Sequence, residues 1–139
     1  MITAKEHYHS AVVNALTKEN WAITANPFDL EQGRTSYGLD WSEEKVIGAK
    51  KNDTQIAITV EEFLTSSPVS EFHLAMGRYM NYRMILDSTD PACLLYLAAP
   101  ADTYSSFFVG QFPQAVVRQH KLKLLFYDPK CEVVTQWVS

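Results

Sequence analysis

Hydrophobic residues recur at helical spacing in the first part of the chain. Apolar side chains at residues 8, 11, 12, 15 and 16 would lie on one face of a helix and point toward a core. Thr3 and Glu6 have the spacing of a capping box, and Asn20 is a residue type that ends helices in the left-handed conformation. These signals predict a helix between Thr3 and Asn20.

The spacing then changes to strict alternation, which is typical of strands. Residues 55–61 place three aliphatic side chains on one face of a strand and Ala57, Thr59 and Glu61 on the other. A second strand is predicted at 46–50, and residues 51–54 have the composition of a hairpin turn between the two. A short strand at 21–24 precedes a polar loop or irregular strand at 28–42.

Helical spacing returns after Ser67 and Pro68, which have the residue types of an N-cap and a first helical position. This helix is predicted to end near Leu86, before a loop at 87–91. Residues 93–99 are apolar on both faces, as expected for a central strand covered by helices on each side. Two short helices and a hairpin of two strands complete the chain (101–108, 113–120, 123–127 and 132–137).

This order of elements predicts one α/β domain with a mixed sheet over residues 1–139. Hydrophobic residues make up 47% of the chain, which excludes disordered and low-complexity classes. Twelve basic against sixteen acidic residues give a net charge of −4, so a protein that coats nucleic acid is not indicated, although a local basic patch remains open.

The apolar runs are too short to cross a bilayer, and residues 1–7 lack the apolar region of a signal peptide. Cys93 and Cys131 have no CxxC spacing and are interpreted as free thiols, with Cys93 buried. A cytoplasmic protein without membrane contact is therefore expected. Phosphate-binding loops, zinc-ligand spacing and the serine-hydrolase elbow are absent from the sequence.

Several short strings, in order along almost the whole chain, resemble the XisH family, the fdxN element excision controlling factors of cyanobacteria. They are AKEHYH (4–9), AVVNAL (11–16), GLD (38–40), EKVI (44–47), IAITVEEF (56–63), AMGRY (75–79), LYLA (95–98) and FYDPK (126–130). The resemblance implies a restriction-endonuclease-like fold, a mixed β-sheet flanked by helices. The site of that fold is an Asp followed, on the next strand, by Glu-x-Lys. The two acids hold a divalent metal, and the Lys offsets charge that develops on the phosphate.

The resemblance places Asp40 at the first acid of that site, Thr59 at the Glu and Glu61 at the Lys. Lys50 stands at a commonly acidic position of the preceding strand. A neutral hydroxyl is a weak ligand for a hard cation, so the resemblance predicts a degenerate nuclease site that requires no cofactor. An alternative is a relocated site, in which Asp40 and Glu61 hold Mg²⁺ or Mn²⁺ and Lys50 projects to the same face as Glu61. An ordinary ion pair between Lys50 and Glu61 is the simpler interpretation of that pair.

Four other residues are candidates for contact with a phosphate or a partner: Arg78, Tyr82, Arg83 and His9. Arg78 stands where the family commonly has Gln, and an ion pair of Arg78 with Glu61 or Asp40 is favoured over a functional contact.

The function implied by the resemblance is control of fdxN element excision during heterocyst development. In that setting the family acts alongside a site-specific recombinase and a small companion protein, XisI. A metal-dependent DNA endonuclease and a DNA-binding module without cleavage are the alternatives. A homodimer is also plausible, since the C-terminal hairpin offers a sheet edge.

Overall fold

A single six-stranded sheet forms the centre of the protein, in a computed structural model that describes residues 4–24, 46–63 and 67–139. Each strand pairs with its neighbour in sequence. The strands are β1 (Ala22–Thr24), β2 (Val46–Lys51), β3 (Thr54–Val60), β4 (Leu94–Pro100), β5 (Leu124–Asp128) and β6 (Val133–Val138). The helices are α1 (Ala4–Lys18), α2 (Pro68–Thr89), α3 (Ala101–Thr103), the π-helix η2 (Tyr104–Phe108) and α4 (Gln111–His120).

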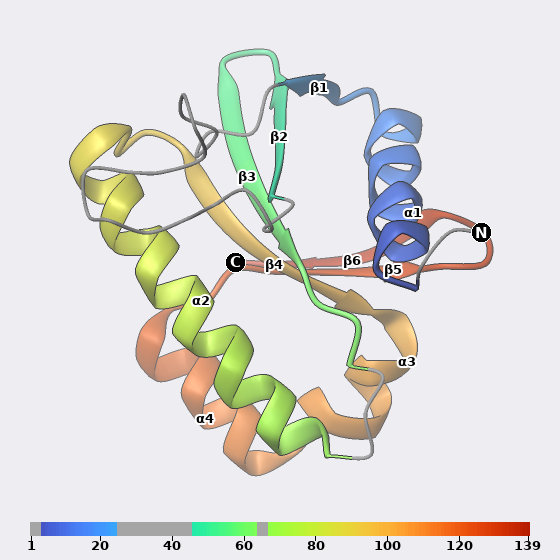
Figure 1. The fold of residues 1–139 in the computed structure, drawn as a ribbon, viewed down its shortest axis with the longest axis vertical. Helices are drawn as coiled ribbons and strands as arrows, with labels where there is room; N and C mark the ends of the chain where they lie inside the picture. The colour runs from blue at the N-terminus through green and yellow to red at the C-terminus, as the bar shows by residue number, and fades with distance from the viewer. Residues whose placement is uncertain (1–3, 25–45, 64–66) are drawn as a thin grey trace.

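The sheet is mixed, as the order of elements predicted. β1, β2 and β3 pair antiparallel, as do β5 and β6, whereas β3, β4 and β5 pair parallel. The parallel strands are joined through α2 and through the segment that contains α3, η2 and α4 (Figure 1). The carboxyl ends of three neighbouring strands therefore meet at one end of the sheet, and their amino ends meet at the other.

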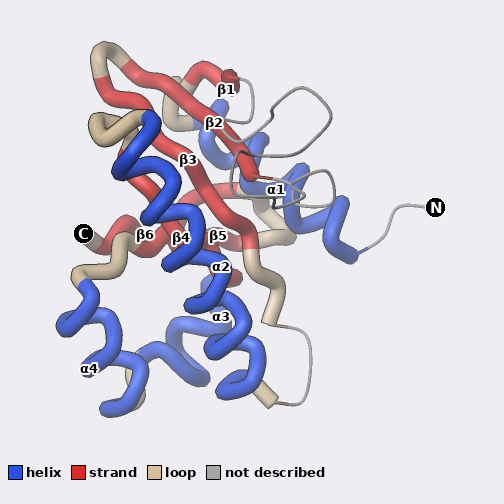
Figure 2. The backbone as a smooth tube through the Cα atoms, turned by 60° about the vertical axis from the view of Figure 1, so that its left-hand side comes forward, coloured by secondary structure: helices blue, strands red, loops and turns tan. Residues whose placement is uncertain are grey.

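Helices cover both faces of the sheet, which explains why the central strand β4 is apolar on both sides. On one face α1 packs against the aliphatic side chains of β2 and β3, including Ile47, Ile56 and Ile58. On the other face α2 packs with η2 and α4 against β3, β4 and β5, and Phe72, Tyr79 and Phe108 are buried there. The two views of the backbone show α1 separated from α2 and α4 by the sheet (Figures 1 and 2).

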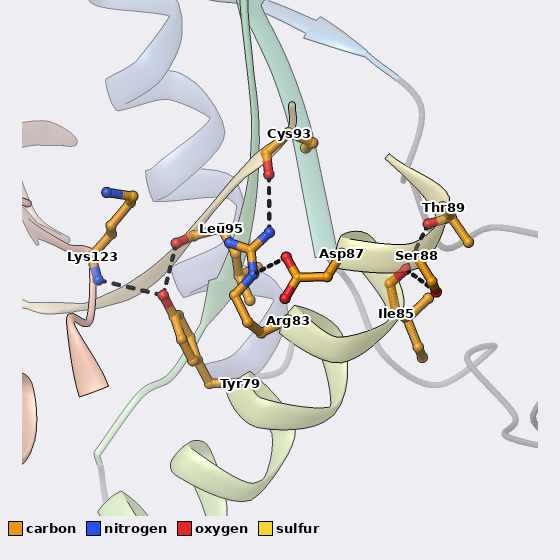
Figure 3. Close-up of polar contacts among 9 residues, drawn as sticks. All are labelled: Tyr79, Arg83, Ile85, Asp87, Ser88, Thr89, Cys93, Leu95 and Lys123. Atoms are coloured by element: carbon orange, nitrogen blue, oxygen red, sulfur yellow. Dashed lines mark hydrogen bonds and ion pairs between the residues drawn. The ribbon is translucent and has the colours of Figure 1, made fainter. Parts of the chain in front are cut away.

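Helix α2 begins as predicted but ends three residues later than the sequence suggested. Ser67 caps it by accepting the N–H of Ser70 at 3.4 Å, with Pro68 in the first position. The prediction of a loop from residue 87 was wrong, because residues 87–89 form the last turn of the helix. The hydroxyls of Ser88 and Thr89 donate to the carbonyl of Ile85 in the same helix, at 3.0 and 2.8 Å (Figure 3).

The smaller expectations are met where the structure describes the residues. Asn20 has φ 71° just after α1, and Cys93 and Cys131 are both free, the first buried and the second exposed. The capping box at Thr3 and Glu6 lies outside the residues whose side chains are described. In the described part of the chain, no helix is long and apolar enough to cross a membrane.

Candidate functional site

Thr59 and Glu61, the two residues at the expected Glu-x-Lys positions, lie at the carboxyl end of β3. They project to the face covered by α2, and only 4% of Thr59 and 7% of Glu61 is exposed. The N–H of Glu61 donates to the carbonyl of Ala98 at 2.9 Å, which extends the parallel pairing with β4 by one more bond. The backbone at Glu61 is thus fixed, and its carboxylate is buried between the sheet and α2.

Arg78 of α2 reaches this carboxylate with two hydrogen bonds. Its Nε donates to Glu61 Oε2 at 3.2 Å, and its Nη2 donates to Oε1. The Thr59 hydroxyl donates to Oε2 at 3.1 Å. Because an unpaired buried carboxylate costs several kcal/mol, a two-pronged Arg contact plus a hydroxyl is the kind of environment that stabilises it. The predicted ion pair between Arg78 and Glu61 is confirmed.

This arrangement, the Thr59–Glu61–Arg78 cluster, limits what the site can do chemically. Both oxygens of Glu61 already accept hydrogen bonds, and a guanidinium lies where a second positive ion would have to approach. Glu61 could ligate a divalent cation only after Arg78 moved away. Within residues 4–24, 46–63 and 67–139, no three His, Cys, Asp or Glu side chains are grouped to hold a metal ion. Asp40, the expected first acid, lies outside the described residues.

Lys50 is not brought to Glu61. It projects to the same face of the sheet, as predicted, but it is an exposed residue opposite Gln55. Glu61 follows Gln55 by six positions along β3, which is about 20 Å. Neither the relocated site containing Lys50 nor an ion pair between Lys50 and Glu61 agrees with this register.

The remaining sequence candidates are held in other ways. Tyr82 is 1% exposed and belongs to the core, so a partner could not reach it without opening the structure. Arg83 donates to Asp87 Oδ1 at 3.1 Å and to the carbonyl of Cys93 at 3.3 Å, which joins α2 to the start of β4 (Figure 3). His9 is half-buried on α1, the helix that covers the opposite face of the sheet.

A second set of polar groups, which no sequence pattern predicted, lies at the carboxyl end of the parallel strands. The Tyr127 hydroxyl, at the end of β5, is buried and has no hydrogen-bond partner among the described residues. Burial raises the pKa of Tyr127, and the negative charge of Glu62 raises it further. Asp102, which follows β4, acts in the same direction. The available signal was topological, because polar residues directly after parallel strands gather at one end of a sheet.

The chain after Glu61 is held in a strained conformation. Phe63 has φ 57°, a conformation in which a bulky side chain costs about 1–3 kcal/mol. Its ring packs edge-on against Phe108, with centroids 5.6 Å apart, and lies 6.2 Å from Phe107. These contacts fix the direction in which the chain leaves Glu61 and Glu62.

A small cavity of about 260 Å³ opens at the same end of the sheet, between the residues that follow β4 and those that follow β5. Asp102 and Lys130 line it together with Asp128. The Asp128 carboxylate accepts the N–H groups of Lys130 and Cys131, at 2.8 and 3.2 Å, and these bonds, that of Cys131 first, lower its pKa. The Asp128 carboxylate therefore stabilises the turn between β5 and β6.

Comparison with known proteins identifies the family. The sequence model described as XisH protein matches residues 2–135. The chain belongs to the XisH family. Its fold is similar to the crystal structure of an XisH family protein from Nostoc punctiforme PCC 73102, with 37% identity and a TM-score of 0.83. It is equally similar to an fdxN element excision controlling factor protein from Anabaena variabilis, with 36% identity and a TM-score of 0.83. Each comparison covers 96% of this chain and 99% of the other. A comparison with curated proteins gave no match.

Membership of the XisH family gives the buried cluster its significance. The resemblance places Glu, Lys and Gln at the positions held here by Thr59, Glu61 and Arg78. In this chain position 59 is uncharged, position 61 carries a negative charge and position 78 carries a positive charge. Glu61 is hydrogen-bonded to both Thr59 and Arg78, so the residue types at the three positions complement one another.

Proposed function

We propose that this protein is a non-catalytic controlling factor of the kind that acts in excision of the fdxN element. It would be built on a restriction-endonuclease-like domain, spanning residues 1–139, whose nuclease site has become a structural contact. One observation carries this proposal: the only carboxylate in the described part of the expected Glu-x-Lys motif, that of Glu61, is occupied by Arg78 and Thr59. The name of the similar Anabaena variabilis protein supports the controlling role.

A protein that controls excision without cutting must act through partners. On this proposal the chain works in the cytoplasm of cyanobacterial cells that form heterocysts, beside an XisI-like companion and a site-specific recombinase, with DNA as the shared target. Copurification of a tagged XisI-like protein with this chain, from cells expressing both, is the expected result for a direct companion. Elution of the two as separate species on size exclusion would contradict the companion role.

The nuclease question is tested on supercoiled plasmid with Mg²⁺ and with Mn²⁺. The wild-type protein should give no nicking, because its Glu61 has no oxygen available for a metal. The matched variant carries Thr59→Glu, Glu61→Lys and Arg78→Gln together, which restores the pattern expected from the resemblance. Metal-dependent nicking by this variant, lost again when Asp40→Ala is added, is the expected sign of a nuclease-like fold.

The opposite result is equally clear. Metal-dependent nicking by the wild-type protein that disappears in Asp40→Ala would overturn the non-catalytic proposal. It would favour an active site in which Asp40 and Glu61 hold Mg²⁺ or Mn²⁺ after Arg78 has moved away.

A further inference from the structure

A larger cavity, of about 480 Å³, lies at the amino end of the parallel strands. It is formed between the last turns of α4, the residues that precede β5 and the end of β6. Figures 1 and 2 both show the end of α4 beside the C-terminal end of β6. Glu61 is at the other end of the same strands, so this amino-end cavity is separate from the Thr59–Glu61–Arg78 cluster.

Three of the five polar residues that line the amino-end cavity are cations, and the other two are Gln114 and Ser139. Arg118, Lys121 and Lys123 line it, and no acidic side chain does. The sequence around it, residues 103–127, contains no Asp or Glu at all. Both ion pairs found in the described part of the chain involve other cations, Arg78 and Arg83. Three cations thus surround one cavity in a protein whose net charge is −4.

The backbone places these cations with some strain. Lys121 has φ 52° and ψ 49°, the left-handed conformation in which helices commonly end with Gly. The turn is closed by the N–H of Leu122, which donates to the carbonyl of Val117 at 3.0 Å. The N–H of Lys123 then donates to the Tyr79 hydroxyl at 3.4 Å, while its ammonium group points away from Tyr79 (Figure 3).

A structural role of these charges explains only part of the arrangement. Cations in the last turn of a helix interact favourably with its carbonyl groups, which accounts for Arg118. The same effect does not explain a lysine in a position that favours Gly, nor Lys123, which lies beyond the helix. A strained residue that supplies a charge to a cavity is a reason to infer a ligand.

The size and the apolar side of the cavity indicate the kind of ligand. Val117, Leu122 and Val138 form its apolar lining. A volume of about 480 Å³ is within the range of pockets for small organic molecules and exceeds what a bare phosphate ion fills. We propose that the amino-end cavity binds a nucleotide, with its phosphate on Arg118, Lys121 and Lys123 and its sugar or base on the apolar side chains. The nucleotide is either free or part of a nucleic-acid strand, and the proposal does not depend on the state of the nuclease site.

Binding measurements with three probes test the proposal: deoxyadenosine monophosphate, a short DNA single strand and a short DNA duplex, the DNA labelled with fluorescein. The variant Arg118→Gln, Lys121→Gln and Lys123→Gln should lose at least about tenfold in affinity for the probe that binds. If a strand is the source, the plot of log affinity against log salt should become shallower by about 2–3, since three phosphate contacts are lost. Binding of the monophosphate alone would identify a free nucleotide.

The matched control is Lys50→Gln with Lys130→Gln, which removes exposed lysines outside the cavity and should leave affinity within about twofold. The decisive single variant is Lys121→Gly, which relieves the left-handed strain. It should raise the melting temperature and weaken binding at the same time. The proposal is overturned if the wild-type protein binds none of the probes, if the triple variant binds as well as the control, or if Lys121→Gly leaves affinity unchanged.

Discussion

The charged groups at the two ends of the parallel strands differ in burial and in pairing. At the carboxyl end, Glu61 is buried and its oxygens are held by Arg78 and Thr59. At the amino end, Arg118, Lys121 and Lys123 surround a cavity and take part in none of the ion pairs of the described residues. The charges of Glu61 and Arg78 thus satisfy each other, whereas the three cations at the amino end are available to a ligand.

The difference follows from burial. A charge removed from water must find partners within the protein, so the Glu61 carboxylate is held in place by Arg78 and Thr59. An accessible cation keeps its water and needs no partner, so it can exchange that water for a phosphate. At the carboxyl end, the position where the resemblance predicts a Lys therefore holds a Glu in a buried ion pair, while at the amino end three cations that no motif announced line a cavity.

The largest expected effect comes from a substitution that breaks the Thr59–Glu61–Arg78 cluster. Arg78→Ala leaves Glu61 buried without its cation and should lower the free energy of unfolding by about 2–4 kcal/mol, measured by urea denaturation. The loss should be smaller than for a fully buried pair, because 35% of the Arg78 side chain is exposed.

Its control is Asp87→Ala, which removes the acidic partner of Arg83 at a site that is largely exposed. This change should cost less than about 1 kcal/mol. Equal losses from Arg78→Ala and Asp87→Ala would show that burial does not distinguish the two ion pairs.

A comparison of two buried tyrosines sharpens the contrast between satisfied and unsatisfied groups. The Tyr79 hydroxyl donates to the carbonyl of Leu95 at 3.1 Å and accepts the N–H of Lys123, so Tyr79→Phe should destabilise by about 1–2 kcal/mol. Tyr127→Phe removes a buried hydroxyl without a described partner and should be neutral or stabilising by up to about 1 kcal/mol. Urea denaturation of both variants gives the comparison. A loss from Tyr127→Phe as large as that from Tyr79→Phe would reveal a partner for Tyr127.

The smallest expected effect is on the stability of the folded protein at acid pH, and it concerns Asp128 at the end of β5. Hydrogen bonds from Cys131 and Lys130 lower the pKa of Asp128 in the folded protein. The stabilisation is therefore fully present above the unfolded pKa, about 3.9, and is lost as the pH falls through the lower folded pKa. Asp128→Asn should make the melting temperature less sensitive to acid below about pH 4. Asp53→Asn, in the exposed β2–β3 turn, is the control. Identical acid profiles for wild type and Asp128→Asn would contradict the prediction.

The sequence predicted much of the sheet because strand patterns are local. Alternation along residues 55–61 placed Thr59 and Glu61 on one face, and the structure agrees. The same alternation could not give the distance between Lys50 and Glu61, because the period of a strand defines a face and the hairpin register sets the position along it. The last turn of α2 was missed because Ser88 and Thr89 are common in loops yet bond to Ile85 here.

The polar contacts at the two ends of the parallel strands could not be predicted equally well from the sequence. The Arg78–Glu61 pair could be predicted once the expected site residues were known. Tyr127 could not be singled out in the sequence, because the burial of its hydroxyl follows from the position of β5 between β4 and β6. The amino-end cavity joins residues from α4, β5 and β6, and no spacing along the chain shows that these segments meet.

The contact between Arg78 and Glu61 also has an evolutionary consequence. Arg78→Gln alone would leave the buried Glu61 carboxylate without its cation. Glu61→Lys alone would place a second positive charge beside Arg78. Each of these single substitutions toward the Glu-x-Lys pattern therefore gives a less stable protein. The two positions are therefore energetically coupled, and we expect relatives that carry one residue of the pair to carry the other as well.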